Sequence, residues 1–160
     1  MIIVSACLLG LNTKYDGTSN AHALIQKYGS SGRFIPVCPE QLGGLPTPRS
    51  PMEIFRGPGQ EVLVGRCAVK GEKGEVVTPQ FIQGEKEVIK IVELVTVTAA
   101  ILKERSPSCG VNHIYDGSFS HCIKPGQGVT AAILKEHNIP IYSEEELTEE
   151  RLVKLLGDDK

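Results

Sequence analysis

The sequence AAILKERSPSCG, residues 99–110, is the stretch that decides the fold. It starts with the small apolar segment AAIL, passes through three charged residues and ends with Cys109 and a glycine. A short apolar run that is bounded by turn-forming residues is typical of a buried β-strand. We therefore predict a strand that delivers the thiol of Cys109 to a loop at its carboxyl end.

Two further cysteines follow apolar runs in the same way. Residues 1–6 (MIIVSA) precede Cys7, and residues 33–37 (RFIPV) precede Cys38. In an open α/β sheet, ligands bind beyond the carboxyl ends of the strands. If the three predicted strands are parallel neighbours, these two thiols and that of Cys109 meet in one crevice. Three thiolates suit a soft metal or an iron–sulfur cluster.

The order of the predicted elements favours a parallel sheet. Asn20 suits the N-cap of a helix over residues 21–28, so a strand, a helix and a strand follow one another in βαβ order. The clearest helical periodicity in the chain begins at Pro79, which suits a first helical turn, and extends to Val95. These features predict the α/β class.

The octapeptide VTAAILKE occurs twice, at residues 97–104 and 129–136, and we expect different structures for the two copies. The first copy follows a helix and precedes Ser-Pro, which favours an extended backbone. The second copy follows Pro-Gly-Gln-Gly and precedes HNIPIY, a pattern of helix, stop and strand. We expect that last strand over residues 139–142 and a terminal helix over residues 144–156.

The middle of the chain is rich in proline and glycine. The prolines of residues 39–58 exclude a regular element longer than a turn or two, and so long an irregular stretch is usually functional. Residues 61–69 and 75–78, separated by KGEKG, predict a small β-hairpin near a sheet edge. Cys67 lies inside that hairpin, where we expect it to act as a small packed hydrophobic residue.

Composition limits the class of function. A chain of 160 residues that is 41% hydrophobic can form a single domain, residues 1–160, with its own core. A net charge of -2, with no long cluster of Lys and Arg, argues against a nucleic-acid polymer or an anionic membrane as partner. Because neither a membrane-spanning run nor a signal peptide is evident, we expect a cytoplasmic protein. In that reducing compartment, five cysteines are better explained as ligands, catalytic groups or core residues than as disulfides.

A carboxylate lies close to one of the three strand-end cysteines. Glu40 follows Cys38 by two residues, with a rigid proline between them. A carboxylate beside a thiol can serve as a general base, although a surface residue or a helix cap explains it equally well. The charged residues 103–105 are expected to be a solvated strand end without a chemical role.

Two hydroxyls precede the last of the three cysteines. Ser106 and Ser108 offer hydrogen bonds next to Cys109, and Gly110 would allow a ligand to approach the backbone closely. Cys122 ends none of the predicted strands, so we expect it to be structural. Among the histidines, only His121 stands at a zinc-ligand spacing to a cysteine, the adjacent Cys122, and we expect this adjacency to be accidental.

Read in order, the sequence resembles the bacterial family, named as a domain of unknown function, that includes 2-thiouracil desulfurase. Each matching block is modestly specific by itself, whereas all of them in order are a strong signal. The blocks are SACLLG (5–10), YDG (15–17), VCPEQLGGLPTPRSP (37–51), LKERSPSCG (102–110), IYDGSF (114–119) and GQGVTAAIL (126–134).

The resemblance implies a Rossmann-like, three-layer α/β fold with a mostly parallel sheet. It implies a 4Fe-4S cluster that is held by Cys7, Cys38 and Cys109, with the fourth iron open and easily lost from an aerobically prepared sample. It also implies that Glu40 and Ser106 are the catalytic pair. The expected reaction is a non-redox desulfuration of a thiolated nucleobase or a related small thiocarbonyl compound.

One position departs from the family pattern, because this chain has Thr13 where many relatives carry a further cysteine. The change leaves the three implied ligands intact and bears on the choice of substrate. Two other functions stay open on the sequence: a three-thiolate zinc hydrolase, and a non-catalytic protein that binds a small molecule or sulfur. The sequence gives no indication of the oligomeric state.

Overall fold

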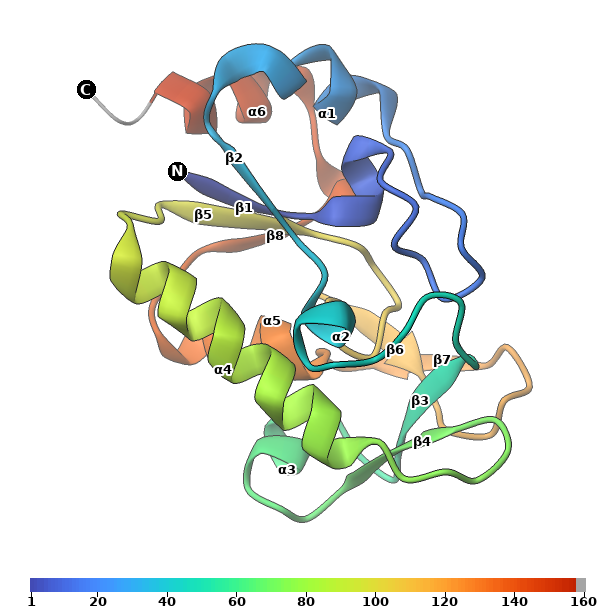
Figure 1. Cartoon of the computed structure of the whole chain (residues 1–160). Helices are drawn as coiled ribbons and strands as arrows, with labels where there is room; N and C mark the ends of the chain where they lie inside the picture. The colour runs from blue at the N-terminus through green and yellow to red at the C-terminus, as the bar shows by residue number, and fades with distance from the viewer. Residues whose placement is uncertain (158–160) are drawn as a thin grey trace.

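A four-stranded parallel sheet forms the centre of the protein. The computed structural model describes residues 1–157. The sheet has the strand order β2-β1-β5-β8, so the first strand lies in the interior of the sheet (Figure 1). Its strands are β1 (Ile2–Ser5), β2 (Phe34–Val37), β5 (Ala99–Leu102) and β8 (Ile141–Ser143). The predicted parallel sheet, with its last strand near residue 141, is confirmed.

The register of the sheet brings three strand ends to one edge. Ile2 is opposite Phe34 on one side and opposite Ala99 on the other, and Ser5 is opposite Val37. Every residue of β1 and β5 is buried, as expected for strands that are covered on both faces. Consequently the segments that follow β1, β2 and β5 all leave the sheet at the same edge.

Helices cover both faces of this sheet, which confirms the predicted three-layer arrangement. Figure 1 shows α1 and α6 on one side of the strands, and α4 and α5 on the other. Ile2, Val4 and Ile101 pack on the first side, whereas Ile3 and Leu102 pack on the second. The helices are α1 (Ala23–Lys27), α4 (Thr78–Leu94), α5 (Val129–Glu136) and α6 (Glu149–Gly157). None of the helices within residues 1–157 is long and apolar enough to cross a membrane.

The two copies of VTAAILKE fold differently, as predicted. Residues 99–102 of the first copy form strand β5, and the whole second copy forms helix α5. The terminal helix starts later than expected, because residues 144–146 form a short 3-10 helix first. Ser143 caps that turn by accepting the backbone N–H of Glu145 at 3.1 Å.

The predicted hairpin over residues 61–69 and 75–78 is only partly confirmed, because Lys70 and Val76 form an isolated antiparallel bridge while the first part of the segment is not a strand. A short helix, α3 (Gly59–Leu63), takes the place of its first half. Strand β4 (Ala68–Gly71) instead pairs antiparallel with β3 (Met52–Phe55), which lies within the stretch expected to be irregular. The prolines of that stretch explain the difference, because they flank β3 without entering it. The other regular element of the stretch is the one-turn helix α2 (Pro39–Leu42).

A second hairpin, formed by β6 (His113–Tyr115) and β7 (Ile123–Pro125), was not predicted. Its strands are only three residues long, and the loop between them contains Phe119 and His121 with positive φ angles. Non-glycine residues rarely adopt this conformation, so local sequence gives little sign of the turn. In Figure 1 this hairpin lies beside β3 and β4 at the same end of the molecule as the strand ends.

Candidate active site

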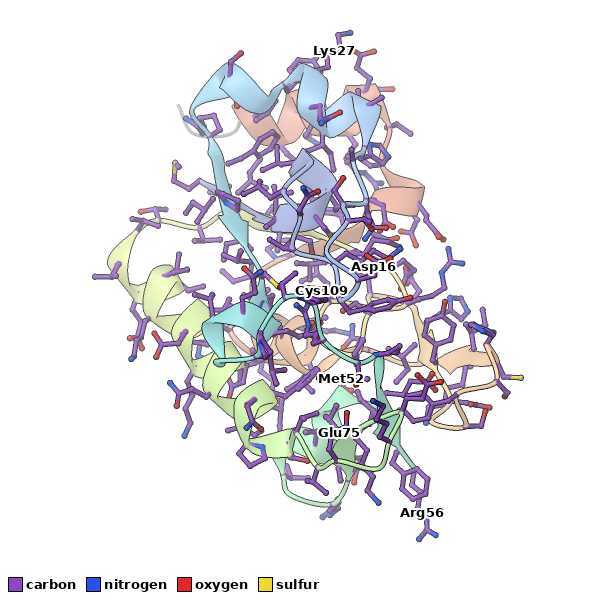
Figure 2. All side chains as sticks on the ribbon, turned by 45° about the vertical axis from the view of Figure 1, so that its right-hand side comes forward. Asp16, Lys27, Met52, Arg56, Glu75 and Cys109 are labelled. Carbon is purple, nitrogen blue, oxygen red and sulfur yellow. The ribbon has the colours of Figure 1, made fainter. Side chains whose placement is uncertain are left out.

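A cavity of about 480 Å³ lies at the sheet edge where β1, β2 and β5 end. Its wall includes the three thiols of Cys7, Cys38 and Cys109 and the side chains of Glu40, Ser106 and Ser108. Figure 2 shows Cys109 near the centre of the molecule, between the loop of Asp16 above it and Met52 below it. The structure thus brings together the three strand-end cysteines and the polar residues that the sequence predicted beside them.

The three thiols reach the cavity from three different local structures. Cys7 lies in the 3-10 turn Ala6–Leu9 directly after β1, and Cys38 is the N-cap of α2 directly after β2. Cys109 ends a tight turn after β5 and is only 4% exposed. All three are free thiols. Neighbouring strand ends, and not closeness in sequence, make this a single site.

Burial keeps the three thiols protonated in the metal-free protein. The pKa of Cys109 is raised to about 12, mainly by desolvation and to a smaller extent by the nearby thiols of Cys7 and Cys38. Desolvation also raises the pKa of Cys7 and of Cys38, while hydrogen bonds from Asn20 to Cys7 and from the backbone of Gln41 to Cys38 act in the opposite direction. A bound metal would displace these protons, because the thiolate is the ligand.

The kind of metal group that a set of thiolates can hold depends on their spacing. Within residues 1–157, no set of three or more His, Cys, Asp or Glu side chains is arranged to hold a single metal ion. Thiolates on one zinc lie about 4 Å apart, since each Zn–S bond is about 2.3 Å long. In a 4Fe-4S cluster each cysteine binds a different iron, so the sulfurs are farther apart. The structure places three soft thiol donors around one cavity, and thiolates are the ligands that hold iron–sulfur clusters.

A directional chain of hydrogen bonds joins the predicted catalytic pair. Ser108 Oγ donates to Glu40 Oε2 at 3.1 Å, and the oxygens of Ser106 and Ser108 lie 3.0 Å apart. Because the Ser108 proton goes to Glu40, its oxygen is the acceptor for the Ser106 hydroxyl. Ser106 Oγ also accepts the backbone N–H groups of Ser108 and Cys109, at 3.2 and 3.0 Å. Glu40 and Ser106 are thus connected through Ser108.

Gly110 has a different role from the predicted one. It is not among the described residues that line the cavity. A Cβ atom at this position would lie 2.7 Å from the carbonyl oxygen of His113 and 2.8 Å from that of Ser106. A glycine is required at position 110 because the backbone carbonyls of His113 and Ser106 pass close to it, and not because a ligand does.

The expectation of a solvated strand end at residues 103–105 is also wrong. Glu104 is only 3% exposed, and its Oε1 accepts the backbone N–H groups of Val111, Asn112 and His113 at 2.9 to 3.0 Å. Burial by itself raises the pKa of Glu104, but these hydrogen bonds outweigh it and hold the pKa below the usual value. Glu104 therefore fixes the loop that carries the serines and Cys109.

Arg49 is a site residue that the sequence analysis missed. Its side chain is 4% exposed, lines the cavity and donates from Nε to Glu40 Oε1 at 3.1 Å. The only signal in the sequence is a single arginine between the prolines of TPRSP. That pattern predicts a rigid loop but not the direction of its side chain.

Aromatic side chains line another part of the cavity wall. Tyr15 and Tyr115 each belong to a Tyr-Asp-Gly turn, and Phe119 and His121 come from the β6–β7 loop. In both turns the aspartate Oδ1 accepts the backbone N–H of the second residue after it, at 3.0 and 2.9 Å. Aromatic rings suit contact with a flat, apolar ligand ring.

The remaining two cysteines are not among the described cavity residues. Cys67 is half-buried and packs against the apolar cluster around Ile54 and Val62, which agrees with the packing role that was predicted for it. Cys122 is exposed in the β6–β7 hairpin. Its predicted structural role is therefore wrong, because an exposed thiol contributes nothing to the core.

Comparisons with known proteins identify the family of this chain. The family model for 2-thiouracil desulfurase matches residues 2–146. The uncharacterized protein YbbK of Bacillus subtilis (strain 168) is 41% identical over 149 residues, which are 93% of this chain and 99% of the relative. Among solved structures, the 4Fe-4S-dependent thiouracil desulfidase TudS is 40% identical, with a TM-score of 0.83 over 97% of each chain. This chain belongs to the 2-thiouracil desulfurase family.

Proposed function

We propose that this protein is a cytoplasmic, 4Fe-4S-dependent enzyme that removes sulfur from 2-thiouracil or a closely related small thiocarbonyl compound. The observation that carries the proposal is the meeting of three free thiols and the Glu40 carboxylate in one cavity. The similarity to TudS over nearly the whole chain supports it. The five free cysteines support a reducing compartment.

Cys7, Cys38 and Cys109 would hold the cluster. When bound by three protein thiolates, such a cluster offers one iron without a protein ligand, which can act as a Lewis acid toward sulfur. The overall reaction needs no electron transfer: water supplies oxygen to the carbon, and sulfur leaves as sulfide together with the two protons of that water. The protein must therefore activate water and move protons.

In the proposed reaction, Glu40 takes a proton from the attacking water. When Glu40 Oε2 gains this proton, it becomes a donor to Ser108, and Ser108 then becomes a donor to Ser106. The hydroxyl hydrogen of Ser106, which otherwise points to Ser108, is released toward the cavity. The chain thus couples the removal of a proton from water to a hydrogen bond that Ser106 donates to the substrate. In this scheme Glu40 is the base, Ser108 is the relay and Ser106 is the group that meets the substrate.

The test is anaerobic purification and reconstitution, followed by quantification of iron and sulfide per chain and by turnover of 2-thiouracil to uracil. We expect a loaded protein that releases uracil and sulfide in equal amounts. A fully loaded protein without turnover of thiocarbonyl compounds would replace this proposal with a binding role. A protein that takes up zinc but not iron, and remains active, would replace it with a zinc hydrolase.

A further inference from the structure

The Arg49 side chain connects the carboxylate and a thiol of the site. We propose that Arg49 is a positioning residue, which holds Glu40 in the orientation that serves the Ser108 hydroxyl and holds the Cys38 thiol beside it. The inference rests on the proposed function, since it takes Glu40 as the base and Cys38 as a ligand.

One guanidinium contacts both groups at the start of α2. Nε donates to Glu40 Oε1 at 3.1 Å, and Nη2 is 3.9 Å from Cys38 Sγ, within the range of a hydrogen bond to sulfur. The side chains of Arg49 and Glu40 are 4% and 13% exposed, so solvent screens this ion pair very little. A displacement of Arg49 would therefore disturb the carboxylate and the thiol together.

The rest of the guanidinium is anchored to two other loops. Arg49 Nη1 donates to the carbonyl of Pro46 at 3.2 Å and to Thr47 Oγ1 at 2.8 Å, and Nη2 donates to the carbonyl of Thr13 at 2.9 Å. The Arg49 backbone N–H donates to the carbonyl of Tyr15 at 2.7 Å. Together with the two contacts to α2, every one of the five guanidinium N–H groups has an acceptor. The orientation of the group is thereby fixed from three segments of the chain.

This anchoring gives the two oxygens of Glu40 separate tasks. Oε1 faces Arg49, while Oε2 accepts the hydroxyl of Ser108 at 3.1 Å. A carboxylate turns readily about its last bond, because this torsion has a broad energy minimum. The buried pair with Arg49 opposes that turn. Arg49 thus reserves Oε2 for the serine chain.

The kinetic test replaces Arg49 by lysine. Arg49→Lys keeps the positive charge but offers three donors from one nitrogen, so it cannot reproduce the planar set of contacts. With the loaded enzyme and 2-thiouracil, we expect kcat to fall about 10- to 100-fold while KM changes less than about twofold. The matched control is Arg66→Lys, because Arg66 forms an exposed pair with Glu61 at 3.5 Å, and it should leave both constants unchanged.

A double variant tests whether Arg49 acts through Glu40. In Glu40→Gln/Arg49→Gln the buried pair is neutral, so no uncompensated charge prevents folding. We expect its kcat to lie within about twofold of that of Glu40→Gln alone, because the group that Arg49 orients is already gone. The proposal would be overturned if the losses of kcat in the two single variants multiplied in the double variant. It would also be overturned if Arg49→Lys kept the kcat of the wild type.

The last readout is independent of activity and of the metal. A crystal structure of metal-free Arg49→Lys should show Glu40 turned away from Ser108, with the hydrogen bond between them lost. Retention of that bond would overturn the positioning role. If the wild type fails to convert 2-thiouracil while this bond is lost in Arg49→Lys, the proposed function is wrong and the positioning of Glu40 by Arg49 is upheld.

Discussion

Two carboxylates follow strands of the same sheet and are held in opposite ways. Glu40 follows β2 and is bound by the side chains of Arg49 and Ser108 at the cavity wall. Glu104 follows β5 and is bound mainly by three backbone N–H groups of the loop after it. A carboxylate that is held by side chains can change its protonation while the chain stays folded. One that is held by backbone amides is part of the fold, so the comparison separates chemistry from architecture.

Of the two carboxylates, Glu40 is the one with a proposed chemical role, so its replacement should have the largest effect. Glu40→Gln keeps the size of the side chain but removes its basicity, so turnover of 2-thiouracil should fall about 100-fold or more. Iron content, measured on the same anaerobic samples, should match that of the wild type. Full turnover in Glu40→Gln would remove the assignment of this residue as the base.

The matching change at the second carboxylate is Glu104→Gln. Its main effect should be on the stability of the fold. The amide cannot accept the backbone N–H groups as a charged carboxylate does, and we expect the free energy of unfolding to fall by about 2 kcal/mol. Denaturant titration of the metal-free protein measures this loss. Turnover per loaded, folded molecule should change little. A large loss of turnover without loss of stability would show that Glu104 takes part in the reaction.

The pH dependence of stability provides a second test of Glu104. Its folded-state pKa is held below the usual value. The carboxylate therefore stabilises the fold fully above its pKa in the unfolded chain, about 4.3, and this contribution is lost as the pH falls through the folded-state pKa. The difference in unfolding free energy between the wild type and Glu104→Gln should be complete at pH 6 to 7 and should decrease below about pH 4. A difference that stays constant over this range would contradict the role of the charged form.

Ser106→Ala should have a smaller effect, because this hydroxyl meets the substrate without acting as the base. Loss of one hydrogen bond, worth about 1 kcal/mol, corresponds to an increase of about fivefold in KM. Steady-state kinetics with 2-thiouracil, at unchanged iron content, measures this increase. A loss of kcat as large as that of Glu40→Gln would instead make Ser106 a direct participant in proton transfer.

The smallest effect is expected from the two cysteines that lie away from the cavity. Cys67→Ala and Cys122→Ser should keep the iron and sulfide content of the wild type, whereas Cys7→Ser should lose most of it. Metal analysis of the three variants after identical reconstitution makes the comparison. Loss of iron in Cys122→Ser comparable to that in Cys7→Ser would show that the ligand set is wrongly assigned.

The sequence predicted the parts of the molecule that depend on local pattern. The apolar runs before Cys7, Cys38 and Cys109 identified the three strands, and the parallel order placed their ends together. The segments around the two VTAAILKE copies were sufficient to predict a strand in one case and a helix in the other. In both cases the deciding information lies within a few residues.

The parts that failed depend on contacts between distant segments. Strand β3 was missed because prolines flank it, and its identity as a strand depends on pairing with β4. Glu104 looked like one member of a charged run, since the amides that bind it are supplied by a turn several residues later. The direction of the Arg49 side chain is likewise set by acceptors from other loops, including the carbonyl of Thr13.

The position of β1 between β2 and β5 also determines when the cavity can form. Ile2 pairs with Ala99, so the interior of the sheet is completed only after most of the chain has left the ribosome. Pairing between segments so far apart in sequence is slow, because a long loop must close first. Small zinc domains gain their fold from metal binding, whereas here the three thiols meet in one site only when β1 has paired with both β2 and β5.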